Sequence, residues 1–375
     1  MARTREHDAC PGALHVHRAA DGALARVRLP GGAITAAQLQ ALATAATRWG
    51  SATLELTSRA NIQIRGITDD DATAAVADAV AAAGLLPSPT HERVRNIVAS
   101  PLSGRVSATS DIRALVTELD EAIRARPALA ALPGRFLFGI DDGRGDISGL
   151  SADAGVHVDG DSAALLLAGR DTGVRLPLPQ VVPTLIDVAQ RFADIRENAW
   201  RIAELDEPTQ LVTGLAVTAP PGATWEPVTR PPVGWIEQRD GRIALGAAVP
   251  LGVLPARTAE FLAAIDAPIA ITPWRSVLVF DLDEARADTA LRVLAPMGLV
   301  FDDQSPWLSV SACTGSPGCA HSAADVRADA AAAAAAGPAA THRHFVGCDR
   351  ACGSPGVGEV LVATGDGYRP RTPSP

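Results

Sequence analysis

Four of the five cysteines form two short pairs near the carboxyl end of the chain. Cys313 and Cys319 enclose Thr-Gly-Ser-Pro-Gly, and Cys348 and Cys352 enclose Asp-Arg-Ala. This spacing favours an iron–sulfur cluster over zinc, because structural zinc sites use shorter intervals between paired ligands. Disulfides would require a small secreted domain, and nothing resembling a signal peptide opens the chain. We therefore predict four thiolates converging from two loops, and we interpret the lone Cys10 as an ordinary thiol.

Length and composition indicate a large soluble protein. With 375 residues the chain exceeds the usual limit of one hydrophobic core, so we expect about two or three packed units. Its apolar stretches are too short to span a bilayer, and a formal charge of −9 disfavours nucleic acid as a partner. We therefore expect a cytoplasmic protein without membrane or nucleic-acid contacts. All 33 basic residues are arginine, so any anion site must use guanidinium groups, which suit carboxylates.

The start of the chain has the pattern of a small α+β unit. Residues 24–29 alternate apolar and charged side chains, as in a half-buried strand, and a Pro-Gly-Gly turn follows. Thr35 is the predicted N-cap of a helix that runs to about Trp49. Residues 54–67 are predicted to form a strand, and Asp69 or the following aspartate caps a second helix. Strand, helix, strand and helix in this order describe an α+β unit.

The second half of the chain repeats motifs of the first at a nearly constant offset. Thr57 matches Thr272, residues 101–104 match 315–318, and residues 138–141 match 346–349. We predict two repeats facing each other across a pseudo-twofold axis, with a central cleft for a large ligand. The cysteine loops of the second half then replace cysteine-free loops of the first.

Arginines of the first half lie in three short segments. They are Arg26 and Arg28, Arg59 and Arg65, and Arg93 and Arg95. Because alternate side chains of a strand share one face, the alternate polar residues from 59 to 65 are expected to point the same way. These residues are Arg59, Asn61, Gln63 and Arg65. Such a row is either a cradle for a polycarboxylate ligand or a solvated face.

Six motifs in order resemble the sulfite and nitrite reductase superfamily. They are Arg-x-Arg-Leu-Pro-Gly-Gly, Thr-Ser-Arg-x-Asn-x-Gln, Arg-Asn-Ile-x-x-x-Pro, Leu-Pro-Gly-Arg-Phe, the first cysteine pair, and a final His-x-x-Gly-Cys-x-x-x-Cys. The resemblance implies an α+β fold with a pseudo-twofold repeat of ferredoxin-like half domains and two reductase-type α+β domains. The implied segments are half domains at 10–68 and 233–299, a domain without a cluster at 69–202, a linker at 203–232 and a [4Fe-4S]-binding domain at 300–375.

The same resemblance assigns roles to individual residues. The cluster ligands would be Cys313, Cys319, Cys348 and Cys352. The catalytic arginines facing the substrate pocket would be Arg26, Arg95 and Arg135. Residues implied to bind the tetrapyrrole are Arg28, Arg59, Asn61, Gln63, Arg65, Asn96, Arg275, His344 and Arg350.

The chain departs from the reductases at two positions. Sulfite reductases have a second cation two residues after the one matched by Arg135, but this chain has Leu137, which cannot stabilise a small multiply charged anion. Between Cys348 and Cys352 the reductases usually have a lysine, whereas this chain has Arg350. The chain is also shorter than those reductases. Its Ala-Cys-Pro-Gly, Asn-Ile-Gln-Ile-Arg-Gly and Thr-Pro-Trp-Arg motifs resemble instead the precorrin-3B synthase branch of the superfamily.

That branch implies an oxygen-dependent monooxygenase of aerobic cobalamin biosynthesis. Precorrin-3A would be hydroxylated at C20 and closed to a γ-lactone, with dioxygen as co-substrate. Electrons would come from an external donor, either an NADH-linked reductase or a ferredoxin, because no dinucleotide-binding motif follows a strand. A mononuclear non-haem iron is also implied, but the spacing of the histidines shows no ligand set for it. The alternative is a sulfite or nitrite reductase that uses sirohaem and a [4Fe-4S] cluster.

Overall fold

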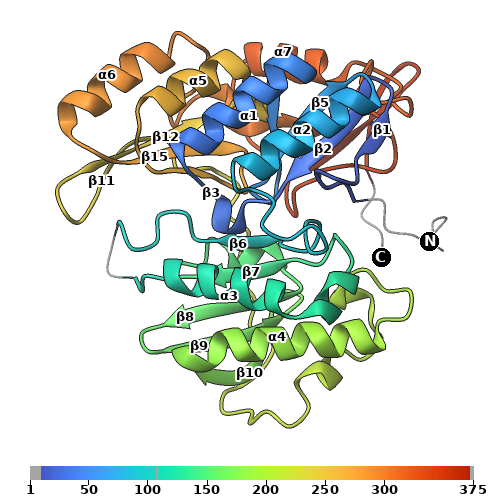
Figure 1. Ribbon diagram of the computed structural model, residues 1–375, viewed down its shortest axis with the longest axis vertical. Coiled ribbons are helices and arrows are strands. Elements are labelled where there is room, and N and C mark those ends of the chain that lie inside the picture. The colour runs from blue at the N-terminus through green and yellow to red at the C-terminus, as the bar shows by residue number, and fades with distance from the viewer. Residues whose placement is uncertain (1–9, 107–108, 372–375) are drawn as a thin grey trace. The chain divides into compact units, whose positions relative to one another are not determined.

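The computed structural model describes residues 10–106 and 109–371 and divides the chain into two compact units (Figure 1). Unit 1 combines Met1–Gly12, Val27–Ala33 and Leu86–Val228. Unit 2 combines Ala13–Arg26, Ile34–Leu85 and Thr229–Pro375. The last four residues of the predicted cluster-binding segment, 372–375, lie outside the described residues.

Unit 2 contains two half domains with the same order of elements. The first consists of β1 (His17–Ala19), β2 (Gly22–Val27), α1 (Ala36–Trp49), β4 (Thr53–Leu56), β5 (Ile62–Ile67) and α2 (Asp70–Ala82). The second consists of β11 (Gly234–Glu237), β12 (Ile243–Ala248), α5 (Ala256–Ala264), β14 (Ile269–Ile271), β15 (Ser276–Leu282) and α6 (Glu284–Leu294). The predicted repeat of half domains is confirmed. Helix α2, which follows the predicted boundary at residue 68, packs against α1.

The two half domains exchange a strand in each direction. One sheet has the order β1-β2-β5-β4-β13 and the other β11-β12-β15-β14-β3. Strand β13 (Val253–Pro255) comes from the second half of the chain and pairs with β4, whereas β3 (Ala33–Ile34) comes from the first half. Helices α1 and α5 also pack together (Figure 1). Through the exchanged strands and the packing of α1 against α5, the two half domains form parts of one compact unit.

Local signals account for the element boundaries in the first half domain. The Thr35 side chain accepts a hydrogen bond from the backbone N–H of Gln38, and the Gln38 side chain accepts one from the backbone N–H of Thr35, so the predicted helix start is confirmed. Asp69 caps α2, as predicted. The predicted continuous strand over residues 54–67 is wrong, because a turn divides it into β4 and β5. Ala60 adopts a φ of 55° in that turn and donates its N–H to the carbonyl oxygen of Thr57.

The last part of unit 2 is a four-stranded sheet that carries the cysteine loops. Its elements are β16 (Val310–Ala312), α7 (Val326–Ala335), β17 (Arg343–Val346), β18 (Glu359–Thr364) and β19 (Gly367–Pro370). Strands β16, β17 and β18 run parallel, and β19 is antiparallel to β18. Parallel neighbours need long connections. One cysteine pair lies in the β16–α7 connection and the other in the β17–β18 connection.

Unit 1 has the same order of strands and helix in a larger sheet. Its elements are β6 (Ile97–Ala99), α3 (Arg113–Ala125), β7 (Phe138–Asp141), β8 (Ala154–Asp159), β9 (Ser162–Leu167), β10 (Arg170–Pro177) and α4 (Leu178–Ile195). Strands β6, β7 and β8 run parallel, and β9 is antiparallel to β8. Helices α3 and α4 pack together on this sheet (Figure 1). Fully buried Phe136, Phe138 and Phe192 form an aromatic cluster in the core.

Strand pairing corrects the predicted match between residues 138–141 and 346–349. Phe138 pairs with Ile97 in β6, and Arg343 pairs with Val310 in β16, so Phe138 corresponds to Arg343 rather than to Val346. The sequence match followed a shared glycine and aspartate, whereas the register of a strand is set by its ladder of hydrogen bonds. The β7–β8 loop of unit 1 still corresponds to the second cysteine loop of unit 2.

Residues of the predicted linker pack onto unit 1. Leu211 is buried in its core, and Val217 forms a bridge with Val174 of β10. Among the described residues, no helix combines the length and apolar character needed to cross a bilayer.

Candidate metal centre and arginine network

The two cysteine loops of unit 2 contact each other through the backbone. The N–H of Gly347 donates to the Sγ atom of Cys313 at 3.4 Å, and the N–H of Ala323 donates to the carbonyl oxygen of Gly347 at 2.9 Å. A Cβ atom added at Gly347 would lie 1.8 Å from the Oγ atom of Ser322. The glycine before Cys348 is therefore required for the close approach of the two loops.

The four cysteine thiols are gathered in one region and form no disulfide. Desolvation raises the pKa of the Cys352 thiol, and the neighbouring thiolates of the other three cysteines raise it further, whereas Arg350 opposes this rise. Among the described residues, no three of these sulfur atoms lie within 4.8 Å of one another. Four unbridged thiols gathered in one region form a donor set of the kind that metal centres use.

A buried chain of hydrogen bonds supports the second cysteine loop. His344 is fully buried in β17 and bonds through Nε2 to the carbonyl oxygen of Cys352 at 3.0 Å and through Nδ1 to the Oγ atom of Ser311 at 2.7 Å. The same hydroxyl contacts Nε2 of His342 at 2.8 Å. Burial, followed by the charge of Arg275, lowers the pKa of His344 to about 3, so this imidazole is neutral. Sequence reasoning missed Ser311 and His342, because no motif marks them.

Of the polar face predicted from residues 59 to 65, only Gln63 and Arg65 lie in strand β5, because Arg59 and Asn61 belong to the turn before it. Gln63 and Arg65 alternate with buried isoleucines in β5. Gln63 accepts a hydrogen bond from Nε of Arg26 at 2.9 Å and donates to Glu55 at 3.3 Å. Arg65 forms a two-point ion pair with Asp21. Glu55 and Asp21 are not among the site residues predicted from the sequence, because both lie outside the arginine-rich motifs.

The other predicted residues of unit 2 lie around the same elements. Half-buried Arg59 is in the turn before β5, and Asn61 is buried beside it. Arg275 occupies the equivalent turn before β15 with a φ of 57°, and it donates to the carbonyl oxygen of Gly353 at 3.0 Å. Arg350 is exposed in the second cysteine loop.

The predicted residues of unit 1 are held by several different partners. Arg28 donates to the carbonyl oxygen of Arg93 at 3.3 Å. Arg95 is buried and forms a two-point ion pair with Asp120 at 2.6 and 3.0 Å. The amide nitrogen of Asn96 donates to backbone carbonyls of its own unit, including that of Gly134.

Arg135 and Leu137 have different surroundings although they are close in sequence. The Arg135 guanidinium is exposed and lies over the Trp200 ring at 4.9 Å. Leu137 is buried, and its N–H donates to Asp153 at 2.9 Å. At the position where sulfite reductases carry a second cation, this chain therefore has an apolar side chain that is packed into the protein.

The β7–β8 loop of unit 1, the counterpart of the second cysteine loop, contains three buried carboxylates instead of thiols. Ligand atoms of Asp141, Asp142 and Asp146 lie within 4.8 Å of one another. Asp141 accepts four backbone N–H bonds, Asp142 pairs with Arg144, and Asp146 accepts from Ser100. Because each carboxylate has partners within the unit, we assign the group a structural role.

Replacing Asp146 by asparagine should change the pH dependence of stability. Burial, opposed by the Ser100 hydrogen bond and reinforced by repulsion from Asp141, raises the pKa of Asp146 to about 7 from 3.8. The folded protein therefore binds this proton more tightly than the unfolded chain, so the free energy of unfolding falls as the pH rises from about 4 to about 7. The variant Asp146→Asn should lack about 2–4 kcal/mol of this fall. Urea unfolding at a series of pH values measures it, and parallel curves for parent and variant would contradict it.

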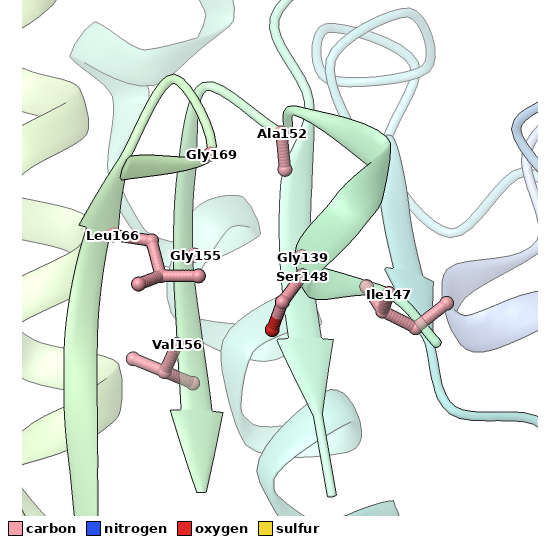
Figure 2. Close-up of a pocket in the computed structure, with 8 residues that line it drawn as sticks. All are labelled: Gly139, Ile147, Ser148, Ala152, Gly155, Val156, Leu166 and Gly169. Atoms are coloured by element: carbon pink, nitrogen blue, oxygen red, sulfur yellow. The ribbon is translucent and has the colours of Figure 1, made fainter. Parts of the chain in front are cut away.

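A small crevice in unit 1 lies over strands β7, β8 and β9 (Figure 2). Four of its eight lining residues have no side chain larger than a methyl group, namely Gly139 in β7, Gly155 in β8, Ala152 before β8 and Gly169 in the turn between β9 and β10. Its volume of about 10 Å³ corresponds to one water molecule. None of the predicted site residues lines it, so it is no tetrapyrrole site.

Comparison with known proteins connects this arrangement to a family. Residues 15–82 match the nitrite/sulfite reductase ferredoxin-like half domain. A precorrin-3B synthase of Sinorhizobium sp. is 28% identical over 381 residues, which cover 96% of this chain and 81% of the relative. The predicted resemblance to the nitrite and sulfite reductase superfamily is confirmed. A ferredoxin–nitrite reductase of Synechococcus elongatus is 26% identical over 397 residues, covering 90% of this chain and 75% of the relative.

A solved structure extends the similarity to the fold of both units. The NirA protein of Mycobacterium tuberculosis has a TM-score of 0.78 and 19% sequence identity, covering 93% of this chain and 73% of its own. The match shows a shared fold. The predicted fold class, with ferredoxin-like half domains and reductase-type α+β domains, is thereby confirmed, and the relatives are oxidoreductases.

Proposed function

We propose that this protein is an oxygen-dependent monooxygenase of the precorrin-3B synthase type, which hydroxylates precorrin-3A at C20 and closes the γ-lactone of precorrin-3B. The observation that carries the choice of this branch is Leu137. Its buried side chain stands where sulfite reductases have a cation, so this position offers no charge to a small anion. The similarity to a precorrin-3B synthase along 96% of the chain supports the same choice.

We also propose that Cys313, Cys319, Cys348 and Cys352 hold a [4Fe-4S] cluster. Their gathered, unbridged thiols and the N–H to sulfur bond from Gly347 fit such a group. When bound, the cluster would supply single electrons, which triplet dioxygen requires for reaction with a closed-shell macrocycle. An external ferredoxin or NADH-linked reductase would provide those electrons. The residues of the chain would bind the carboxylates of the tetrapyrrole and fix its orientation, as guanidinium groups do well.

The decisive experiment combines metal analysis with turnover. Protein purified without oxygen should contain iron and sulfide, and with a reductant and ¹⁸O₂ it should convert precorrin-3A to a product that carries one labelled oxygen atom. Conversion that proceeds equally without dioxygen would overturn the proposal. Zinc without iron or sulfide would overturn the cluster assignment.

A second candidate is a sirohaem-dependent sulfite or nitrite reductase, which the similarity to the Synechococcus elongatus enzyme favours. In that case the tetrapyrrole would be a prosthetic group rather than a substrate. Strong Soret and α bands in the purified protein, together with reduction of nitrite or sulfite, would establish this candidate. A broad cluster absorbance alone supports the monooxygenase.

Replacing Arg59 by alanine should weaken the binding of precorrin-3A. We propose that this half-buried guanidinium pairs with a substrate carboxylate, and loss of one charged hydrogen-bonded pair should raise the dissociation constant about 10- to 100-fold. Titration of the tetrapyrrole measures the change. Arg292→Ala, at an exposed arginine of α6, is the control. Unchanged affinity in Arg59→Ala would contradict a carboxylate contact.

A further inference from the structure

Arg65 of the first half domain contacts the first cysteine loop directly. Its Nε and Nη2 atoms donate to the Asp21 carboxylate at 3.0 and 2.9 Å, and Nη2 also donates to the carbonyl oxygen of Gly318 at 3.0 Å. Gly318 immediately precedes Cys319. A Cβ atom added at Gly318 would lie 2.8 Å from Cγ2 of Thr314 and 3.1 Å from Oδ2 of Asp21, so the loop is closely seated on this ion pair.

A second contact links the same sheet to the helix that follows the loop. Glu55 in β4 lies 3.8 Å from Nε of Arg65 and 2.5 Å from Nη2 of Arg327, near the start of α7. Both Glu55 and Arg65 are buried. The hydrogen bond from Arg65 to Gly318 and the ion pair between Glu55 and Arg327 therefore attach the β16–α7 connection and the start of α7 to the first half domain.

Arg275 of the second half domain makes the matching contact with the second cysteine loop. Its Nη2 atom donates to the carbonyl oxygen of Gly353, which immediately follows Cys352. A Cβ atom added at Gly353 would lie 2.7 Å from that nitrogen. Loss of hydration and then Arg327 lower the pKa of Arg275, whereas the charges of Glu55 and Cys313 oppose this fall.

We propose that Arg65 and Arg275 are positioning residues for the metal centre, each half domain holding one cysteine loop by a carbonyl oxygen next to a ligand. This inference rests on the proposed cluster. It changes the interpretation of both arginines, because Arg65 donates to Asp21 and Gly318 and Arg275 donates to Gly353, rather than to a substrate carboxylate. The Arg275 guanidinium interacts with the charge of Cys313, and the Arg65 guanidinium contacts the carbonyl oxygen next to Cys319, so both add positive charge near the centre, which favours the reduced, more negative state of a cluster.

The test uses the complete protein, purified without oxygen, with the variants Arg65→Gln, Arg275→Gln and Asp21→Asn. All three should lose the visible cluster absorbance in air about ten-fold faster than the parent, the factor expected from one lost charged hydrogen bond. The midpoint potential should become more negative in the two arginine variants, which lose a positive charge, and less negative in Asp21→Asn, which loses a negative one. Affinity for precorrin-3A should stay within about two-fold of the parent.

Two further variants separate positioning from general stability. Arg18→Gln removes an exposed arginine–aspartate pair of the same half domain and should change neither bleaching nor potential. Arg65→Lys keeps the positive charge but cannot form all three hydrogen bonds. Its cluster should therefore bleach faster than that of the parent, with a midpoint potential near the parent value. This variant replaces Arg65→Gln if Arg65→Gln fails to fold.

The outcomes distinguish this inference from the proposed function. A parent protein without iron and sulfide would defeat both. A parent with a cluster, but with bleaching and potential unchanged in Arg65→Gln and Arg275→Gln, would overturn the positioning role alone. Weakened binding of precorrin-3A with an unchanged cluster in Arg65→Gln would instead establish Arg65 as a substrate-binding residue.

Discussion

Replacing Cys352 by serine should abolish the cluster and all turnover of precorrin-3A. A serine hydroxyl ionises far less readily than a thiol and is a poor ligand for iron, so the three remaining cysteines cannot complete the set. His344 fixes the backbone of Cys352 by donating from Nε2 to its carbonyl oxygen, so the substitution changes the ligand atom with little change to the loop. We expect iron and sulfide content to fall about ten-fold or more and conversion to become undetectable, as measured by metal analysis and product formation.

Cys10→Ser is the matched control for this experiment. Cys10 lies far from the cysteine loops in sequence, and the cluster proposal gives it no role. This variant should keep the iron, the sulfide and the conversion of the parent. Equal loss of iron in both variants, or full activity of Cys352→Ser, would contradict the assignment of Cys352 as a ligand.

Features with strong local signals were predictable from the sequence. Thr35 and Asp69 cap helices because their side chains can reach backbone N–H groups three residues ahead, which is a property of neighbouring residues alone. The match between Thr57 and Thr272 also held, because both close a turn whose fourth residue has a positive φ. Here the repeat in sequence and the repeat in structure coincide.

Features that depend on pairing between distant segments were not predictable. The turn between β4 and β5 cannot be predicted from composition, because the residues on both sides of it have the composition of a strand. The match of Phe138 to Val346 failed because β-sheet register depends on the neighbouring strand, here β6 or β16, and not on loop residues.

The arginine-rich motifs locate the cations of the first half but do not predict the partners of those cations. Arg65 pairs with Asp21 and Gly318, and Arg95 pairs with Asp120, and in each case the partner lies many residues away in the sequence. A motif that lists only cations cannot distinguish a ligand cradle from an internal ion pair, because both need a buried guanidinium. The cysteine pairs differ from the arginines, because their spacing alone predicts a kind of ligand, the proposed cluster.

Replacing Asp141 by alanine should destabilise unit 1 by about 4 kcal/mol. This fully buried carboxylate accepts four backbone N–H bonds at 2.8–3.0 Å, which define the loop after β7. The donors are Gly143, Gly145, Ile147 and Ser148. Alanine would leave these donors without an acceptor, and each buried donor without a partner costs about 1–3 kcal/mol, less whatever is recovered when the loop relaxes and admits water.

Urea unfolding measures this loss of free energy, and two further variants make it specific. Asp141→Asn keeps one carbonyl oxygen but turns a donor toward the remaining N–H groups, so it should lose roughly half as much stability as Asp141→Ala. Asp187→Ala removes an exposed carboxylate from α4 in the same unit and should change stability by less than about 0.5 kcal/mol. If Asp141→Ala were no less stable than Asp187→Ala, the carboxylate could not be the group that holds the loop. The same loop position in unit 2 carries the second cysteine pair. That result would therefore also remove the reason to compare the two loops, in which a buried carboxylate in one repeat stands where the other has the proposed metal ligands.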